Sequence, residues 1–213
     1  MEFQIMDLET WPRRETFLHF LEEVPCTYSI TVELDITRLW RETRVRGIGL
    51  FPALLYGLSR QVNCQEAFRM DFNEAGQVGA YRQCSPCYTV FHPETEGFTN
   101  VWTEYDPVFS TFCRNYRADR ERYRGDFRHG KPDAPPNLFS VSCVPWTSFT
   151  GFHLDLPKGH TYLRPIFTIG KYTCREDTVR VPVAVQVHHS VCDGFHTARF
   201  LNGLQAWAES FSC

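Results

Sequence analysis

The sequence lacks an apolar stretch long enough to cross a bilayer, and it has no large excess of either charge. The longest mostly apolar stretch, residues 48–58, is far shorter than the ~20 residues of a transmembrane helix, so we expect a buried helix there. The first residues include Glu2 and Asp7, where a secretory signal would carry basic side chains, and we expect a cytoplasmic protein. The net charge of -3 provides no general attraction to anionic surfaces, so neither nucleic acid nor a membrane is an expected partner.

The chain also lacks internal repeats, linker-like tracts and paired cysteine motifs. Its 213 residues, 43% of them hydrophobic, are enough for one substantial core, and we expect one domain over residues 1–213. The only C-x-x-C is residues 84–87, and a zinc site would need a second ligand pair at comparable spacing. Nine cysteines are an odd number without an export signal, so we expect reduced thiols and no metal site.

Hydrophobic periodicity predicts helices and strands in irregular succession. Helical spacing of apolar residues appears over 13–23 and 195–211, and we expect another helix over 107–123. Alternation over 28–36 predicts a half-buried strand with Tyr28 on its inward side. Short strands are expected as a meander at 67–72, 77–82, 88–92 and 98–103, then at 138–144, with a long hairpin formed by 165–174 and 178–188. This mixture predicts an α/β (α+β two-layer) fold with a mixed β-sheet packed on helices.

A candidate site for chemistry lies where the last predicted strand ends. Residues 181–187 are almost wholly apolar, as expected of a central strand, and His188 and His189 follow directly. Asp193 then opens the last predicted helix, so an imidazole and a carboxylate share one strand-to-helix turn, which suits a general base and its orienting group. A structural role fits equally well, because Asp is a common helix N-cap and most histidines are not catalytic. The local pattern alone leaves both interpretations open.

Five segments, in order, extend the pattern over nearly the whole chain. Residues 188–196 read HHSVCDGFH, which is similar to a signature H-H-x-V-C-D-G-F-H, and residues 10–15 read TWPRRE, similar to W-x-R-R-E. The other segments are 89–98, 139–146 and 169–172. Together they resemble the type A chloramphenicol acetyltransferases. H-x-x-x-D alone occurs in other acyltransferases, but five ordered matches in a chain of the family's length are specific.

The resemblance implies an enzyme that uses acetyl-CoA as a co-substrate, without a permanently bound cofactor, to acetylate the 3-hydroxyl of chloramphenicol and so give antibiotic resistance. It implies a homotrimer with active sites between neighbouring subunits. His189 would act as general base, removing the hydroxyl proton as that oxygen attacks the thioester, with no acyl-enzyme. Ser142 would donate to the oxyanion of the intermediate, and Asp193 with Arg13 would form a buried ion pair that holds the histidine turn.

The resemblance also implies an acceptor pocket that suits a nitrophenyl ring and a dichloroacetamide. Its expected lining is Phe20, Tyr28, Cys87, Phe98, Ser140, Leu154, Tyr162, Ile166 and Thr168. Lys171 and Tyr172 lie where the family accommodates coenzyme A. Without the resemblance, the aromatic residues would be assigned to the core and Ser142 to an ordinary strand hydroxyl.

Three pocket positions depart from the family. Characterised members commonly have Tyr where Phe20 stands, many have Phe at Tyr28, and Gln occurs at Cys87. Each change alters acceptor affinity by about one hydrogen bond, ~1 kcal/mol net. The acyl-transfer residues are therefore better supported than the identity of the acceptor.

Two alternatives remain open. One is an acyltransferase of the same fold acting on another hydroxyl or thiol, although the related dihydrolipoyl acyltransferase cores usually carry H-R-x-x-D-G and lipoyl domains, neither of which we find here. The other is a non-catalytic drug- or CoA-binding protein, which would need none of His189, Ser142, Arg13 and Asp193. The Arg-rich stretch over 114–131 is interleaved with acidic residues and indicates a solvated helix face rather than a nucleic-acid site.

Overall fold

A large mixed sheet forms one layer of the protein, as a computed structural model covering residues 2–126, 130–156 and 161–212 shows. Six of its strands follow the order β2-β10-β8-β7-β5-β6, and β9 pairs only with β10. The strands are β2 (Thr27–Asp35), β5 (Ser85–His92), β6 (Gly97–Trp102), β7 (Leu138–Val144), β8 (Ile166–Gly170), β9 (Thr173–Arg175) and β10 (Thr178–His188). Pairs β5·β7 and β7·β8 are parallel and the others antiparallel, so the predicted mixed sheet is confirmed.

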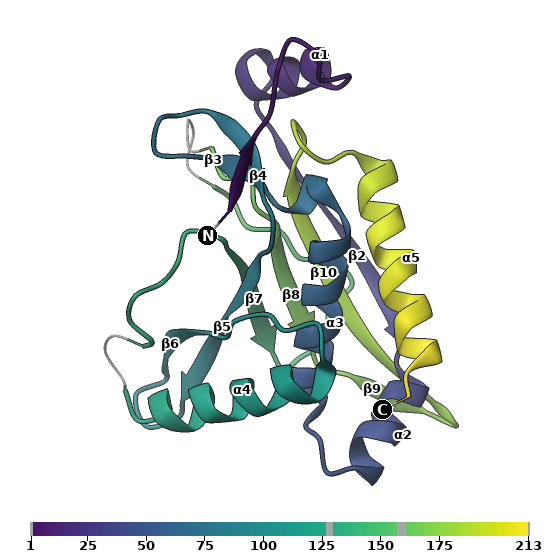
Figure 1. Ribbon diagram of the computed structural model, residues 1–213. Coiled ribbons are helices and arrows are strands. Elements are labelled where there is room, and N and C mark those ends of the chain that lie inside the picture. Colours follow the sequence, from purple (N-terminus) through teal and green to yellow (C-terminus); the bar gives the residue numbers. More distant parts are fainter. Residues whose placement is uncertain (1, 127–129, 157–160, 213) are drawn as a thin grey trace.

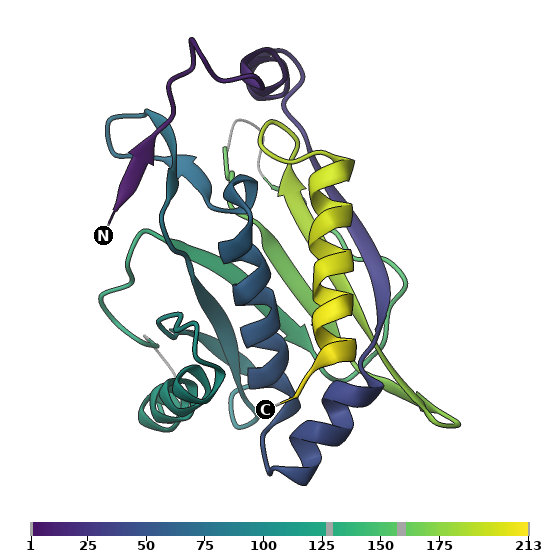
Figure 2. The same cartoon turned by 45° about the vertical axis from the view of Figure 1, so that its right-hand side comes forward.

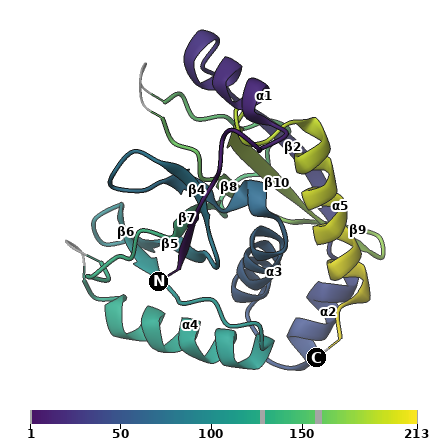
Figure 3. The same ribbon diagram turned by 45° about the horizontal axis from the view of Figure 1, so that its top comes forward.

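Helices cover one face of this sheet. The helices α3 (Leu50–Cys64) and α5 (Gly194–Ser210) lie side by side over it, and α4 (Phe109–Tyr123) contacts α3 and β6 (Figures 1 and 2). The helix α2 (Thr37–Val45) follows β2 and packs against α3 and α5. At the other end of the sheet, α1 (Arg14–Leu18) lies beyond the point where β10 turns into α5 (Figure 3). No helix in the described ranges is long and apolar enough to span a membrane.

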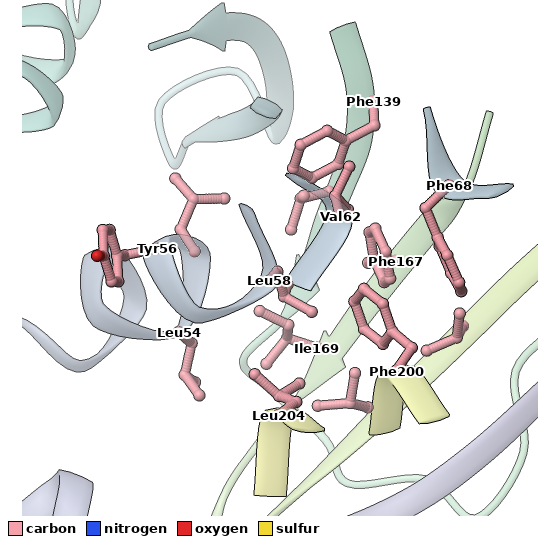
Figure 4. Close-up of a cluster of buried hydrophobic side chains, with 14 of the residues drawn as sticks. Leu54, Tyr56, Leu58, Val62, Phe68, Phe139, Phe167, Ile169, Phe200 and Leu204 are labelled. Atoms are coloured by element: carbon pink, nitrogen blue, oxygen red, sulfur yellow. The ribbon is translucent and has the colours of Figure 1, made fainter. Parts of the chain in front are cut away.

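Strand alternation explains which side chains enter the core. Because successive residues of a strand point to opposite faces, Val181, Val183 and Val185 all face the helices and are at most 1% exposed. Phe167 from β8 stacks on Phe200 from α5, with ring centres 5.1 Å apart, and the surrounding apolar side chains fill the space between sheet and helices (Figure 4). Each such fully buried side chain contributes about 1.5–3 kcal/mol to folding. The apolar strand predicted over 181–187 therefore provides a large part of the buried core.

A second, three-stranded sheet corrects the predicted meander. Its order is β1-β4-β3, with β1 (Phe3–Ile5), β3 (Met70–Phe72) and β4 (Val78–Tyr81). The hairpin around residues 73–76 forms as predicted, but it pairs with the N-terminal strand instead of continuing into β5. The strand predicted from residue 67 begins only at Met70, because Glu66–Phe68 form a 3-10 turn. This turn places Phe68 in the core, where its ring stacks on that of Phe200.

Two other predicted elements are interrupted. The helix predicted over 13–23 is an α-helix only to Leu18 and continues as a π-helix, His19–Glu23, in which the Val24 amide donates to the His19 carbonyl at 2.9 Å. The strand predicted over 165–174 breaks after Gly170. Ile169 pairs with Val183 and Thr173 with Arg180, so three residues oppose two and the chain bulges at 170–172. The Lys171 amide leaves the ladder and donates to the Thr147 carbonyl.

Candidate active site

The ring of His189 is enclosed by two aromatic rings from its own chain. His189 follows β10 directly, and its amide donates to the Cys26 carbonyl, which extends the β10·β2 pairing by one residue. Phe20, on the π-helix, stacks face to face on the imidazole with ring centres 3.8 Å apart and planes 11° apart. Tyr28, on β2, meets the same ring edge-on at 5.2 Å. The wide π turn thus brings Phe20 onto the imidazole, a placement typical of π-helices at functional sites.

Hydrogen bonding fixes the tautomer of His189. Its Nδ1 lies 3.2 Å from the Cys192 carbonyl oxygen. A carbonyl oxygen can only accept, so Nδ1 carries a hydrogen, and the neutral form of the ring has its lone pair on Nε2. The side chain is therefore prepared to accept a proton at Nε2.

An ion pair closes the turn that carries His189. Arg13 Nη1 donates to Asp193 Oδ2 at 2.7 Å, across 180 residues of sequence. Asp193 Oδ1 caps α5 by accepting from the Phe195 amide at 3.0 Å and from His196 Nδ1 at 2.8 Å. Desolvation would raise the pKa of Asp193, but the bonds from Arg13 and His196 outweigh it and lower the pKa to about 2. The carboxylate is thus ionised, and it ties the N-terminal segment to the β10–α5 turn.

The neighbouring His188 is held differently. It is 4% exposed, and its Nδ1 lies 2.7 Å from the Ser190 hydroxyl. Burial, and the neighbouring His189, lower its pKa, so this ring stays neutral. Its position suits a structural role, in line with the choice of His189 as the candidate base.

A second group of candidate residues lies on the face of the sheet opposite the helices. Strand pairing places Gln186, Ile166, Ser140 and Cys87 in one row across β10, β8, β7 and β5. Two residues further along the strands, Thr168 pairs with Ser142 on the same face. The other predicted pocket residues join this group: the Tyr162 hydroxyl lies 3.1 Å from Ser140 Oγ, both backbone groups of Leu154 bond the Gln186 side chain, and Phe98 on β6 shares this face, 66% exposed.

Within one chain, these two groups lie far apart. Ser142 pairs with Thr168 and Thr168 with Ala184, so Ser142 lies two strands away from β10 and five residues back from His189. Strands are about 4.8 Å apart and rise about 3.3 Å per residue, which separates the two α-carbons by roughly 20 Å. The structure thus brings Arg13, Phe20, Tyr28 and Asp193 to His189, but it does not bring Ser142 there.

An apolar cleft of about 350 Å³ opens at the bulge in the β8–β10 hairpin. Lys171 and Tyr172 lie at the bulge, and the floor comes from α3, β7 and β8. The lining is completed by Leu50, Phe51, Leu54, Cys143, Pro145, Ile169, Gly170 and Val181. Because Cys143, Ile169 and Val181 point toward the helices, the cleft lies on the helix-covered face of the sheet, opposite the Ser142 face, at the end away from His189.

The cysteines provide no metal site in the described part of the chain. The eight cysteines there are free, and no group of three or more His, Cys, Asp or Glu side chains is placed to hold a metal ion. Within the C-x-x-C pair, burial raises the pKa of Cys84 to about 12, so its thiol stays protonated. Cys87 belongs instead to the row that contains Ser140.

Comparison with known proteins decides the family. The model of the chloramphenicol acetyltransferase family matches residues 1–205. The chain belongs to the chloramphenicol acetyltransferase family. A relative from Vibrio anguillarum named chloramphenicol acetyltransferase is 48% identical over 96% of this chain and 94% of its own, and one from Clostridium perfringens is 46% identical over 96% and 98%. The expected acetyl-CoA-dependent O-acetyltransferase class is thereby confirmed.

Solved structures confirm the fold class. A chloramphenicol acetyltransferase structure superposes with a TM-score of 0.88 at 25% identity and covers 97% of this chain and all of its own. The cubic core of the pyruvate dehydrogenase multienzyme complex superposes with a TM-score of 0.68 at 16% identity, over 92% of this chain and 86% of its own, which shows a shared fold alone.

Several residues that shape the site escaped the sequence analysis. The Cys192 carbonyl orients His189, the Thr197 hydroxyl lies 2.7 Å from the Tyr28 hydroxyl, and His196 Nδ1 donates to Asp193 Oδ1. The spacing of residues 193 and 196 was an available signal for the contact between His196 and Asp193, because it is the N-cap to N3 distance. No sequence spacing indicates the other two contacts, since they depend on the path of the turn and on the packing of α5 against β2.

Proposed function

We propose that this protein transfers the acetyl group of acetyl-CoA directly to the 3-hydroxyl of chloramphenicol and so confers resistance to it. Relatives named chloramphenicol acetyltransferase match 96% of the chain. The observation that carries the proposal is the fixed tautomer of His189, because a base that removes a hydroxyl proton needs a free lone pair held in one orientation.

The proposed reaction uses His189 as base and Ser142 as oxyanion donor. His189 Nε2 takes the hydroxyl proton of the acceptor as that oxygen bonds to the thioester carbonyl carbon. The carbonyl oxygen becomes an oxyanion that accepts a hydrogen bond from the Ser142 hydroxyl, a contribution of about 3–4 kcal/mol in comparable sites. Collapse of the intermediate breaks the C–S bond, and the leaving thiolate takes the proton back from His189, so free CoA and the acetyl ester are released with no acyl-enzyme.

The proposed assembly is a homotrimer in which each site combines His189 of one subunit with Ser142 of its neighbour. Two observations support it. The roughly 20 Å between these residues within one chain is too far for both to act on one substrate, since reacting groups must lie about 3 Å from the atoms they serve. The Ser142 face of the sheet also exposes large apolar side chains, Phe91 by 41%, Phe98 by 66% and Trp146 by 59%. A second subunit would cover this surface.

The substrates fit two regions beside β7, one on each face of the sheet. The row that contains Cys87, Ser140 and Ile166 combines apolar surface with a few hydroxyl and thiol groups, as an acceptor with a nitrophenyl ring requires. The apolar cleft beside Tyr172 suits the pantetheine arm of acetyl-CoA, and Lys171 supplies a cation for its phosphates. Neither substrate requires a resident cofactor or metal.

An assay of thiol release tests the proposal. Protein, acetyl-CoA and chloramphenicol should release one free CoA thiol per acetylated product, measured with a thiol reagent. His189→Gln should lower kcat by about 10²–10⁴-fold, the range typical of a general base, while thermal unfolding stays unchanged. His153→Gln, at a 43% exposed histidine whose ring lies near Asp155, is the matched control and should keep full activity.

Other outcomes separate the alternatives. Thiol release with other alcohols or thiols but not with chloramphenicol would favour a different acceptor on the same machinery. Tight binding of chloramphenicol with no release of thiol would contradict the enzyme and favour a binding protein.

A further inference from the structure

Arg164 lies beside the acceptor residues, yet the proposed reaction gives it no role. It stands two residues before β8, and its Nη1 donates to the carbonyl oxygens of Pro136 and Leu138, both at 2.7 Å. Its Nε lies 2.9 Å from Asp71 Oδ2. The two side chains are only 22% and 17% exposed, so this is a largely buried ion pair.

This one guanidinium joins three separate segments. Asp71 is the middle residue of β3 in the small sheet, Leu138 begins β7, and Arg164 precedes β8 in the large sheet. Burial raises the pKa of Asp71, and the charge of Arg164 opposes that shift. Loss of Arg164 would therefore leave a buried carboxyl without its cation.

The same guanidinium lies against a predicted acceptor residue. The Arg164 guanidinium carbon lies 5.1 Å from the centre of the Tyr162 ring, within the range of a cation–π interaction. The hydroxyl at the other end of that ring lies 3.1 Å from Ser140 Oγ. Ser140 precedes Ser142 by two residues and shares its face of the sheet, so Tyr162 connects Arg164 to the polar groups of this face.

Contacts, not secondary structure, set the position of Tyr162. Residues 161–165 form neither helix nor strand, and Leu163 is the nearest buried side chain, at 1% exposure. A tyrosine on such a segment keeps one orientation only where its ring is held from more than one side. Here the guanidinium holds the ring and Ser140 holds the hydroxyl.

We propose that Arg164, anchored by Asp71, is a positioning residue of the acceptor site that fixes the Tyr162 hydroxyl and Ser140 as one polar contact for the acceptor. The inference rests on the proposed function, because it assigns the acceptor to this face of the sheet. A preset contact lowers the ordering cost of binding, so its loss weakens acceptor binding in ground and transition state alike. The effect falls on the KM of the acceptor and spares both kcat and the KM of acetyl-CoA.

The test is Arg164→Met, which keeps the apolar stem and removes the guanidinium. The KM for chloramphenicol should rise about tenfold, with kcat and the KM for acetyl-CoA changed less than twofold. The matched control is Lys131→Met, which breaks the Lys131–Asp119 pair, 2.7 Å long and 15% and 18% exposed. That variant should leave all three constants unchanged, because its pair contacts none of the acceptor residues.

A double-mutant cycle asks whether Arg164 acts through Tyr162. Tyr162→Phe should raise the acceptor KM. The double variant, with Arg164→Met added, should raise this KM by less than the product of the two single fold-increases. A double variant whose acceptor KM rises by the full product of the two single fold-increases would overturn the proposal. So would an unchanged acceptor KM in Arg164→Met, or equal changes in all three constants.

Two further results complete the test. Should Arg164→Met fail to fold, Asp71→Asn takes its place, since it keeps the bonds from Arg164 to the two carbonyls. A raised acceptor KM in Asp71→Asn supports the proposal and an unchanged one overturns it. A wild-type protein that does not acetylate chloramphenicol overturns the proposed function and this inference together, whereas an active wild type with an unaffected Arg164→Met overturns the inference alone.

Discussion

At the scale of single residues, Asp193 links pH to stability. Its pKa of about 2 in the folded protein is below the value near 3.9 of an unfolded aspartate, so the folded state binds this proton less readily. The resulting stabilisation is present above about pH 4 and is lost as the pH falls to about 2. With a side chain 32% exposed, we expect about 1–2 kcal/mol from this group after solvent screening.

Urea unfolding measures this contribution. The free energy of unfolding of the wild type should exceed that of Asp193→Asn at pH 5, and the gap should narrow by about 1 kcal/mol by pH 2.5. The control is Glu33→Gln, which removes the exposed carboxylate 3.8 Å from Arg180. Its free energy of unfolding should differ little from that of the wild type at either pH. A gap for Asp193→Asn that stays constant with pH would contradict the lowered pKa.

The candidate site could be predicted only in part from its residues. The local pattern around His189 indicated a base or a cap without deciding between them, and only the resemblance linked Arg13 to Asp193, because no spacing rule connects residues 180 positions apart. The structure adds the stacked ring of Phe20. That contact depends on a π turn, and hydrophobic periodicity does not distinguish a π turn from an α-helix.

At the scale of secondary-structure elements, the packing of α3 against α5 requires a glycine. A Cβ built on Gly57 would lie 2.3 Å from the Trp207 ring, and this ring is confined by Tyr56 and Phe211. Alanine favours a helix over glycine by about 1 kcal/mol, whereas overpacking costs typically 1–3 kcal/mol. The clash outweighs the propensity, so Gly57→Ala should lower the free energy of unfolding by up to about 2 kcal/mol.

Gly203 on α5 provides the comparison. A Cβ there meets the side-chain oxygen of Gln61 at 2.5 Å, and a flexible amide can turn away where an indole cannot. Gly203→Ala should therefore cost less than Gly57→Ala in the same unfolding measurement. Equal losses in both variants would contradict the assigned role of the Trp207 ring.

Elements with strong periodicity were predictable and the others were not. The strand over 138–144 and the last helix follow the sequence pattern closely, since both bury a regular apolar face. The helix α2 was missed because only Leu39 and Thr43 of its nine residues are buried, which leaves almost no apolar stripe. The strand β1 has only three residues, too few to show an alternating pattern. Because β1 pairs with β4, the hairpin β3–β4 belongs to a second sheet and not to the predicted meander.

At the scale of the whole molecule, the candidate site residues form two separate groups within one chain. The His189 group lies at the end of the sheet beside α5, while the Ser142 group lies on the face without helices. A C₃ arrangement in which each subunit offers one group to each neighbour would assemble three equal sites. The single domain over residues 1–213 and the trimer both stay predictions at this scale.

Complementation between two inactive variants tests the shared site. His189→Gln and Ser142→Ala should each be nearly inactive alone, since each variant lacks one half of every site. Mixed trimers formed by unfolding and refolding the two together at equal amounts should place an intact His189 opposite an intact Ser142 in about a quarter of the interfaces, and activity should recover to about that fraction of the wild type. The two variants mixed without unfolding control for exchange of subunits. No recovery in refolded mixtures that elute as trimers would mean that both residues act within one chain, which the roughly 20 Å separation argues against.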